Sequence, residues 1–455
     1  GRVLGMSYGE VDTIAKLIPP PVQGRHIPLS VSIKEDPDLR KEYQSNERAK
    51  RLIDQAMKLE GTIRNNGVHA AGVVIAPEEI VKYTPLQRAQ KGGISTQYSM
   101  GPVEELGLLK MDFLGLSNLT IINNALRIIR KVYDTDIDIS TIPLDDAKTF
   151  KLLSSGDTTG VFQLESAGMK RYIRDLKPDA FDDIVAMVAL YRPGPMQWID
   201  DFINRKHGRT EITYTHPAME NSLKSTYGVL VYQEQVMQIA KEMCGFTGGQ
   251  ADTLRKAIGK KQVSVMAKMK TDFIEGAVKV SGADRAKTEE FWMALEDFAA
   301  YCFNKSHAAC YGLIAYQTAY LKAHYPDAYM AALMTSDHDN IERIAIEVAE
   351  CRKMGIEVLP PDINESYLEF AVVKGKKQIR FGLLAVKNVG EGPIAAILSA
   401  REAGGEFKSL EDFCKRVPAS DVNKKVWESL IKCGAFDRYG SRETLLANVE
   451  SLTAF

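Results

Sequence analysis

Residues 107–116 read Gly107-Leu108-Leu109-Lys110-Met111-Asp112-Phe113-Leu114-Gly115-Leu116. In an extended chain alternate side chains share a face, so the apolar Leu109, Met111 and Phe113 are expected on one face. Lys110 and Asp112 then lie together on the other. We therefore expect a buried strand that carries a cation beside a carboxylate, which suits a site that holds a metal ion and a phosphate. The alternative is a structural ion pair on a half-exposed strand.

An aspartate on a strand can bind Mg²⁺ through its hard oxygens, together with waters and substrate phosphates. A two-metal site needs further anionic ligands. Asp134, Asp136 and Asp138 alternate as ligands might, but they follow a basic helix and precede a proline turn, so a solvated loop is the better interpretation. His69 lies in the neighbouring apolar stretch. If Asp112 binds metal, we expect its partner carboxylates upstream of the first residue.

Length and composition indicate a multidomain, cytoplasmic protein. The chain has 455 residues, a length typical of two to four domains, and a formal charge of −1 that neither implies nor excludes a nucleic-acid role. No stretch approaches the roughly 18 apolar residues that span a bilayer, and no signal peptide opens the chain. The six cysteines include no C-x-x-C pair, which argues against zinc and fits a reducing compartment. The chain also starts in mid-pattern without an initiator Met, so we interpret it as a piece of a longer protein.

Apolar periodicity divides the chain into segments. Two helical stripes are expected within residues 1–66, around 11–18 and 49–61. The pattern of 68–113 is typical of strands, with a hairpin turn at Gly92-Gly93. Residues 118–350 are expected to be mainly helical, and a short strand-rich unit is expected to begin at 359–364.

A basic run occupies residues 254–261 and contains Arg255, Lys256, Lys260 and Lys261. On a helix these cations can project towards one ligand and clamp a triphosphate or a nucleic-acid backbone. A solvated helix face is the alternative. The lack of an acidic residue between Asp252 and Asp272 weakens that alternative.

Two further segments could bind anions. In residues 301–307, Asn304 or Ser306 can cap a helix, leaving free N–H groups beside Lys305 and His307. An ordinary capped helix with a satisfied histidine is equally compatible with this pattern. Arg192 precedes Pro-Gly-Pro, which would hold it on a stiff turn where it could bind a phosphate or serve as a plain turn residue.

Residues 384–397 indicate a helical hairpin with a glycine turn. An apolar helix is expected to break at Gly390 and Gly392, and a new helix to start with Pro393. This resembles a helix-hairpin-helix element, whose turn offers backbone N–H groups to DNA phosphates without reading sequence. A plain helical hairpin is the alternative.

Taken together, these motifs resemble the C-family replicative DNA polymerases of bacteria, the polymerase III alpha subunits. The resemblance extends along the chain in the family's order and rests on residues 69–77, 110–116, 160–166, 192–195, 232–235, 254–261, 303–307 and 359–364. It implies an α+β multidomain fold with a helical thumb in 1–66 and, in 67–117, the C-terminal part of a palm of the polymerase-beta-like nucleotidyltransferase type. Large, mainly helical fingers would occupy 118–358, and 359–455 would end them with the helix-hairpin-helix unit.

The resemblance also implies roles for single residues. Asp112 matches the third catalytic carboxylate and metal ligand, and Lys110 matches the lysine beside the primer end. Nucleotide or template contacts are implied for a set of fingers residues, which are Arg192, Arg255, Lys256, Lys260, Lys261, Asn304, Lys305, Ser306 and His307. Gly390 and Gly392, in the turn that resembles a helix-hairpin-helix, are the candidates for binding DNA phosphates.

The resemblance implies template-directed, 5′-to-3′ DNA synthesis in chromosome replication with two Mg²⁺ ions. Primer–template DNA and deoxynucleoside triphosphates would be the substrates, and a sliding clamp, a clamp loader and a proofreading exonuclease the replisome partners. The family's D-x-D pair, its triphosphate-binding Gly-Ser, its N-terminal phosphoesterase domain and its clamp-binding and C-terminal regions are not among residues 1–455, so we expect this chain alone to be inactive. Two alternatives remain: a non-catalytic DNA-binding scaffold and an error-prone translesion member of the same family.

Overall fold

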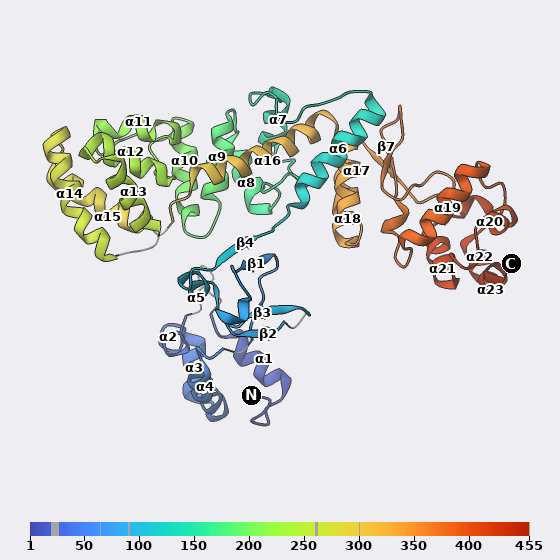
Figure 1. The fold of residues 1–455 in the computed structure, drawn as a ribbon, viewed down its shortest axis with the longest axis horizontal. Helices are drawn as coiled ribbons and strands as arrows, with labels where there is room; N and C mark the ends of the chain where they lie inside the picture. Colours follow the sequence, from blue (N-terminus) through green and yellow to red (C-terminus); the bar gives the residue numbers. More distant parts are fainter. Residues whose placement is uncertain (20–26, 64, 90–91, 260–262, 300, 455) are drawn as a thin grey trace. The chain divides into compact units, whose positions relative to one another are not determined.

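The computed structural model describes residues 1–19, 27–63, 65–89, 92–259, 263–299 and 301–454. The chain divides into two compact units, Gly1–Gly115 and Leu116–Phe455, which are described separately below. Lys260 and Lys261 of the basic run lie outside the described residues. Figure 1 gives the element labels used from here on.

The first unit begins with four helices: α1 (Tyr8–Lys16), α2 (Leu29–Glu35), α3 (Pro37–Ser45) and α4 (Glu47–Leu59). Ser7 and Glu10 form a capping box that starts α1, and Asn46 caps α4. A small core of Ile14, Leu39 and Ile53 lies among them. Both helices expected from apolar periodicity are therefore confirmed.

The rest of the first unit carries short strands: β1 (Gly72–Ile75), β2 (Leu86–Arg88), β3 (Ile94–Thr96) and β4 (Leu109–Asp112), with α5 (Met100–Glu105) before β4. Strands β2 and β3 form an antiparallel hairpin, and the left-handed φ angles of Gly92 and Gly93 confirm the glycine turn. Strand β4 pairs with β1 in a separate two-stranded antiparallel sheet.

The expected burial of β4 is wrong for this chain. Leu109, Met111 and Phe113 are 58%, 46% and 64% exposed. The reason is that β4 pairs only with β1 among the described residues, so the apolar face lacks a second layer that would cover it. The polar face is instead the better packed, because the Lys110 side chain is only 20% exposed.

The second unit begins with a long helical region, as expected. Its helices are α6 (Ser117–Tyr133), α7 (Ala147–Ser155), α8 (Ala167–Leu176), α9 (Phe181–Leu190), α10 (Ile199–Lys206), α11 (Glu220–Leu223), α12 (Gln233–Cys244), α13 (Gly248–Gly259), α14 (Val263–Ser281), α15 (Arg285–Ala299), α16 (Lys305–His324), α17 (Pro326–Ser336) and α18 (Ile341–Lys353). Helix α16 is central, because it packs against α7, α9 and α17 (Figure 1). One core surrounds α9 and α16, and a second lies among α12 to α15.

The strand-rich unit expected from residue 359 is confirmed only in part. A three-stranded sheet orders β5 (Glu357–Leu359), β7 (Gln378–Arg380) and β6 (Ala371–Val372), with β5 and β7 parallel. Helices follow it: α19 (Glu391–Gly404), α20 (Leu410–Arg416), α21 (Lys424–Lys432), α22 (Arg442–Ala447) and α23 (Val449–Ala454). These helices share one core, in which Trp427 stacks on Phe436 and Phe413 meets both rings edge-on.

Among the described residues, none of the helices has both the length and the apolar character needed to cross a lipid bilayer.

Candidate functional site

Lys110 and Asp112 lie side by side on β4, as the alternation predicted. The Lys110 Nζ is 2.7 Å from Asp112 Oδ1, and the carboxylate remains 45% exposed. The hydrogen bond that Lys110 donates lowers the pKa of the Asp112 carboxyl below its usual value. Asp112 is therefore ionised at neutral pH, and it presents hard oxygen to solvent.

The segment that leads into β1 brings His69 to the same place. Its Nδ1 lies 3.9 Å from Asp112 Oδ1 and accepts a hydrogen bond from the Ala71 N–H at 3.2 Å. Because Nδ1 acts as an acceptor, its lone pair points at that N–H and the ring proton belongs on Nε2. His69 thus borders the carboxylate without donating to it through Nδ1.

Gly72 makes this crowding possible, and sequence reasoning missed it. It lies opposite Asp112 in the β1–β4 register. A Cβ built on Gly72 would lie 2.9 Å from His69 Nδ1, 2.9 Å from Lys110 Cε and 3.1 Å from Asp112 Oδ1. The signal was present, because a glycine inside an apolar strand marks a close approach by other atoms.

The described residues hold no group of three or more His, Cys, Asp or Glu side chains that could bind a metal ion. The loop with alternating aspartates is a solvated loop, as preferred, since Asp136 pairs with Arg130 and Asp138 accepts from Ser140. Asp112 can therefore supply one hard-oxygen ligand, and a Mg²⁺ site would need others from outside these residues.

Two of the expected anion-binding motifs, the 301–307 segment and the Arg192 turn, meet in the second unit. Main-chain hydrogen bonds join Phe303 to Val231 and Gln233, so the 303–307 segment lies beside the start of α12. Arg192 donates Nε to Ala189 O at 2.8 Å and Nη2 to Tyr301 O, and its guanidinium lies 4.3 Å from the Phe303 ring centre. The guanidinium therefore holds the 301–303 segment against the Pro-Gly-Pro turn.

The expectation that the first N–H groups of α16 are free is wrong in this structure. Asn304 is the N-cap, and its Oδ1 accepts from the His307 N–H at 2.8 Å. Glu234 of α12 accepts from Asn304 Nδ2 and from the Lys305 N–H, each at 2.9 Å. An internal carboxylate thus occupies the place where an anion was expected, because a negative side chain is stabilised at a helix N-terminus.

The other side chains of this segment pack on aromatic rings. The His307 ring lies 4.4 Å from Tyr311, and Lys305 Nζ lies 5.5 Å from the Tyr232 ring centre. Ser306 follows the cap in the first turn of α16.

The cations of α13 also have an internal partner. Asp252 pairs with Arg255 at 2.9 Å and with Lys256 at 2.8 Å, one turn along the helix. The expectation of an uncompensated basic run is therefore wrong for Arg255 and Lys256. Asp252 lies just before the run, and on a helix it is close enough to pair with both residues.

The glycine turn of the C-terminal hairpin is open. Gly390 is the N-cap of α19, which begins at Glu391 with no side-chain cap among the described residues, two residues earlier than expected. A Cβ on Gly390 or Gly392 would meet nothing within 4 Å. Before the turn lies a 3-10 segment, Leu383–Ala385, in place of the expected helix. The first N–H groups of α19 therefore face outwards, where a phosphate could bind them.

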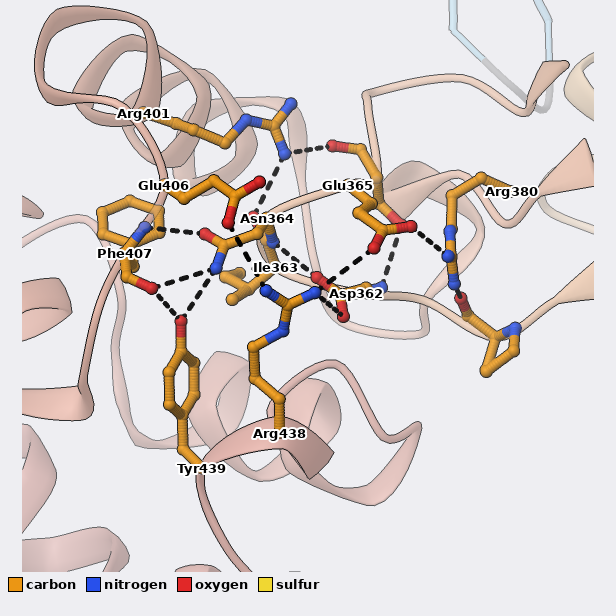
Figure 2. Close-up of polar contacts among 12 residues, drawn as sticks. Asp362, Ile363, Asn364, Glu365, Arg380, Arg401, Glu406, Phe407, Arg438 and Tyr439 are labelled. Atoms are coloured by element: carbon orange, nitrogen blue, oxygen red, sulfur yellow. Dashed lines mark hydrogen bonds and ion pairs between the residues drawn. The ribbon is translucent and has the colours of Figure 1, made fainter. Parts of the chain in front are cut away.

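A polar cluster joins residues 362–365 to α19 and to the chain around Phe407 and Tyr439, as Figure 2 shows. Asn364 donates Nδ2 to Phe407 O at 3.0 Å and to the Tyr439 hydroxyl at 2.9 Å, and its Oδ1 accepts from the Phe407 N–H at 2.8 Å. Arg438 lies 3.2 Å from both Asp362 and Glu365. The 359–364 segment thus has a structural role, since its side chains hold the chain around Phe407 and Tyr439 in place.

The sequence of the chain is similar to known proteins. The sequence model for the "Bacterial DNA polymerase III alpha NTPase domain" matches residues 1–115, the model for the alpha subunit finger domain matches 118–281, and a helix-hairpin-helix model matches 355–445. The DNA polymerase III subunit alpha of Thermus aquaticus is 50% identical over 99% of this chain and 37% of its own length. The same subunit of Escherichia coli K12 is 48% identical, over 98% of this chain and 39% of its own length.

The chain therefore spans less than half the length of these relatives. Two models of one family follow each other along residues 1–281, and the two relatives align with nearly the whole chain. The chain belongs to the family of bacterial DNA polymerase III alpha subunits.

Proposed function

We propose that this chain supplies part of the catalytic centre and the nucleic-acid-binding body of a DNA-directed DNA polymerase that replicates the bacterial chromosome. The observation that carries the proposal is the ionised Asp112 beside Lys110 over the gap left by Gly72, in a chain of this family. The substrates would be primer–template DNA and deoxynucleoside triphosphates, and the reaction 5′-to-3′ nucleotidyl transfer.

Asp112 would hold Mg²⁺ together with two carboxylates outside this chain. Its exposure and its hard oxygens fit that ion. Bound Mg²⁺ would lower the pKa of the primer 3′-hydroxyl and would offset negative charge on the departing pyrophosphate. Lys110 donates to Asp112 and lowers the pKa of that carboxyl further, and its ammonium can bind the primer-terminal phosphate or the transferring phosphoryl group.

The proposed domains follow the resemblance: thumb in 1–66, the C-terminal part of the palm in 67–117, fingers in 118–358, and the end of the fingers with the helix-hairpin-helix in 359–455. The division of contacts after Gly115 and the matched helix-hairpin-helix segment support two of these boundaries. Clamp, clamp-loader and exonuclease contacts would belong to other parts of the polymerase.

Internal contacts support a division of roles among the residues proposed to meet nucleotide or template. Arg192 and Asn304 make internal hydrogen bonds, which supports a positioning role for both. Lys305 and His307 remain candidates for direct contact, and so do Arg255 and Lys256 if DNA displaces Asp252. Gly390 and Gly392 would bind the duplex backbone through main-chain N–H groups.

The test is primer extension by the full-length polymerase that contains this chain, comparing Asp112→Asn with the wild type. We expect a loss of about 100-fold or more with DNA binding retained, because one preorganised charge is removed. Asp136→Asn is the matched control, since Asp136 is an exposed carboxylate paired with Arg130 in the solvated loop. Equal extension by wild type and Asp112→Asn would contradict the assignment.

Two other outcomes point to the alternatives. No extension by any variant, with salt-sensitive duplex binding that ignores nucleotide and Mg²⁺, would favour a DNA-binding scaffold. Extension with frequent misincorporation would favour a translesion member of the family.

A further inference from the structure

A groove of about 460 Å³ lies between α6 and the segment that leads into β6. Its walls include Ile128 and Val132 of α6, Leu368 and Phe370 before β6, and Leu398 of α19. The groove is thus largely apolar in its depth, and it lies wholly within the second unit. None of the motifs discussed above contributes a site residue to it.

A half-exposed tyrosine forms part of this groove. Tyr367 is 53% exposed, and its hydroxyl makes no hydrogen bond among the described residues. The guanidinium of Arg401 lies 4.9 Å from its ring centre, and Lys131 Nζ lies 5.9 Å away. Arg401 is fixed there, because it donates to Ile363 O at 3.1 Å and to Ser366 O at 2.7 Å (Figure 2).

The rim of the groove is positively charged. Arg127, Lys131 and Lys374 line it, and Glu369, which pairs with Arg127, is the one carboxylate among its lining residues. Lys131 and Lys374 form no ion pair within the described chain. Arg127 and Lys131 lie one helical turn apart, about 6 Å along the axis of α6.

The turn between β6 and β7 adds more positive charge. It carries Lys374, Lys376 and Lys377 around Gly375, all exposed, with no acidic residue between Glu369 and Glu391. The cations therefore extend beyond the groove along the chain.

We infer that this groove binds a stretch of single-stranded DNA, with an unpaired base stacked on Tyr367 and the neighbouring phosphates against Lys131, Arg127 and Lys374. Sequence-independent binding of single strands combines these two elements, an aromatic ring for the base and a cationic track for the backbone. The inference rests on the proposed function for the choice of DNA.

A free nucleotide fits the groove less well than a strand does. One triphosphate needs fewer cations than the rim and the β6–β7 turn provide, whereas successive phosphates can use all of them. The positive charge of the rim and of the β6–β7 turn favours a polyanion. Besides a nucleic acid, an acidic peptide is therefore the competing occupant. Arg401 and Lys131 lie over the Tyr367 ring, and a nucleobase can stack on the part of this half-exposed ring that they leave open, which favours a nucleic acid over a peptide.

The experiment uses the full chain, residues 1–455, and a short oligodeoxythymidylate that carries 5-iododeoxyuridine, a photoreactive base. We expect a covalent adduct on Tyr367, located by peptide mass spectrometry, in the absence of Mg²⁺ and nucleotide. An excess of unlabelled oligodeoxythymidylate should suppress the adduct, and dTTP should not. Adducts only at other residues would overturn the inference.

Variants give an independent measure by fluorescence anisotropy. Tyr367→Ala should weaken oligodeoxythymidylate binding about 5- to 100-fold, the size of one lost base stack, while Tyr367→Phe should keep it within about 2-fold. A strand of equal length without bases should bind Tyr367→Ala and wild type alike. Equal loss for the strand without bases would overturn the stacking role, because Tyr367 would then contribute to binding without a base to stack on it.

The charge contribution has its own control. Lys131→Gln should weaken binding and reduce the salt dependence, whereas Lys415→Gln should change neither, since Lys415 on α20 is paired with Glu411. Because none of these measurements uses Mg²⁺ or synthesis, their failure beside intact primer extension would overturn the groove assignment alone.

Discussion

Gly72 leaves room for the candidate catalytic centre because it has no Cβ. The side chains of Lys110, Asp112 and His69 close over its Cα, and an added Cβ would lie within about 3 Å of all three. The strand pairing needs no glycine at this position, because the φ angle of Gly72 is not among the left-handed ones. The requirement for glycine is therefore set by these side chains.

We predict that Gly72→Ala lowers primer extension about 10-fold or more with little loss of stability, since the methyl group would force Lys110 away from Asp112. Gly101→Ala is the control, because Gly101 in α5 has open space around its Cα. Extension rates and thermal unfolding of the two variants would be compared. Normal extension by Gly72→Ala would show that the side chains can rearrange around a methyl group.

Glu347 of α18 is a second residue whose chemistry depends on its surroundings. Its carboxylate is fully buried, and Arg343 Nε lies 2.9 Å from Oε1. Neither oxygen makes a well-directed hydrogen bond among the described residues. Burial, and then Asp337, raise the pKa of Glu347 to about 9. This shift favours the protonated form of Glu347 in the folded chain at neutral pH.

This shift predicts a pH-dependent stability. Between the ordinary carboxyl pKa and about 9 the folded state holds a proton that the unfolded state has released, so stability falls as pH rises through this window. We predict that Glu347→Gln removes this slope, and that its stability relative to wild type grows by up to about 1.4 kcal/mol per pH unit. Urea unfolding of both chains at pH 5, 7 and 9 would measure it. Parallel pH profiles would mean that Arg343 keeps Glu347 ionised.

At the scale of elements, the local sequence pattern predicted where several helices and strands lie, but it did not predict which of them contact one another. Apolar spacing predicted α1, α4, the β2–β3 turn and the position of β4. It could not predict that Glu234 would take the N-terminus of α16, because the two lie 70 residues apart and the pairing is a consequence of packing. The burial of β4 failed for a related reason, since alternation fixes the two faces of a strand and not what covers them.

The hydrogen bonds of Asn364, which join the 359–364 segment to Phe407 and Tyr439, give a prediction at the scale of elements. Asn364 makes three side-chain hydrogen bonds at a buried position, to Phe407 and Tyr439. Asn364→Ala should reduce the free energy of unfolding by about 2–4 kcal/mol, because the buried Phe407 N–H would lose its acceptor. The exposed Asn448, which makes one side-chain bond to Thr444, is the control, and Asn448→Ala should cost below about 1 kcal/mol. Denaturant unfolding followed by tryptophan fluorescence measures both, since Trp427 lies in the same core.

At the scale of the whole molecule, the two units differ in how completely they bury their apolar side chains. The second unit contains several large cores. The first has one small core among its helices, while apolar side chains of β1 and β4 remain exposed. Two paired strands with bare apolar faces are marginal in water, and they favour the addition of further strands or a covering layer.

We therefore predict that the β1–β4 sheet is covered in the full-length polymerase. The N–H of Phe113 already bonds Ala71 O, so by antiparallel alternation the N–H groups of Lys110 and Asp112 point away from β1. Hydrogen exchange of the peptide that spans β4 should be at least about 10-fold slower in the full-length polymerase than in residues 1–455, because those groups gain partners. The peptide of α9, buried in the second unit, is the internal reference and should exchange alike in both. Equal exchange of the β4 peptide in both proteins would mean that this edge stays open, and that the partner carboxylates for Asp112 do not come from an adjoining strand.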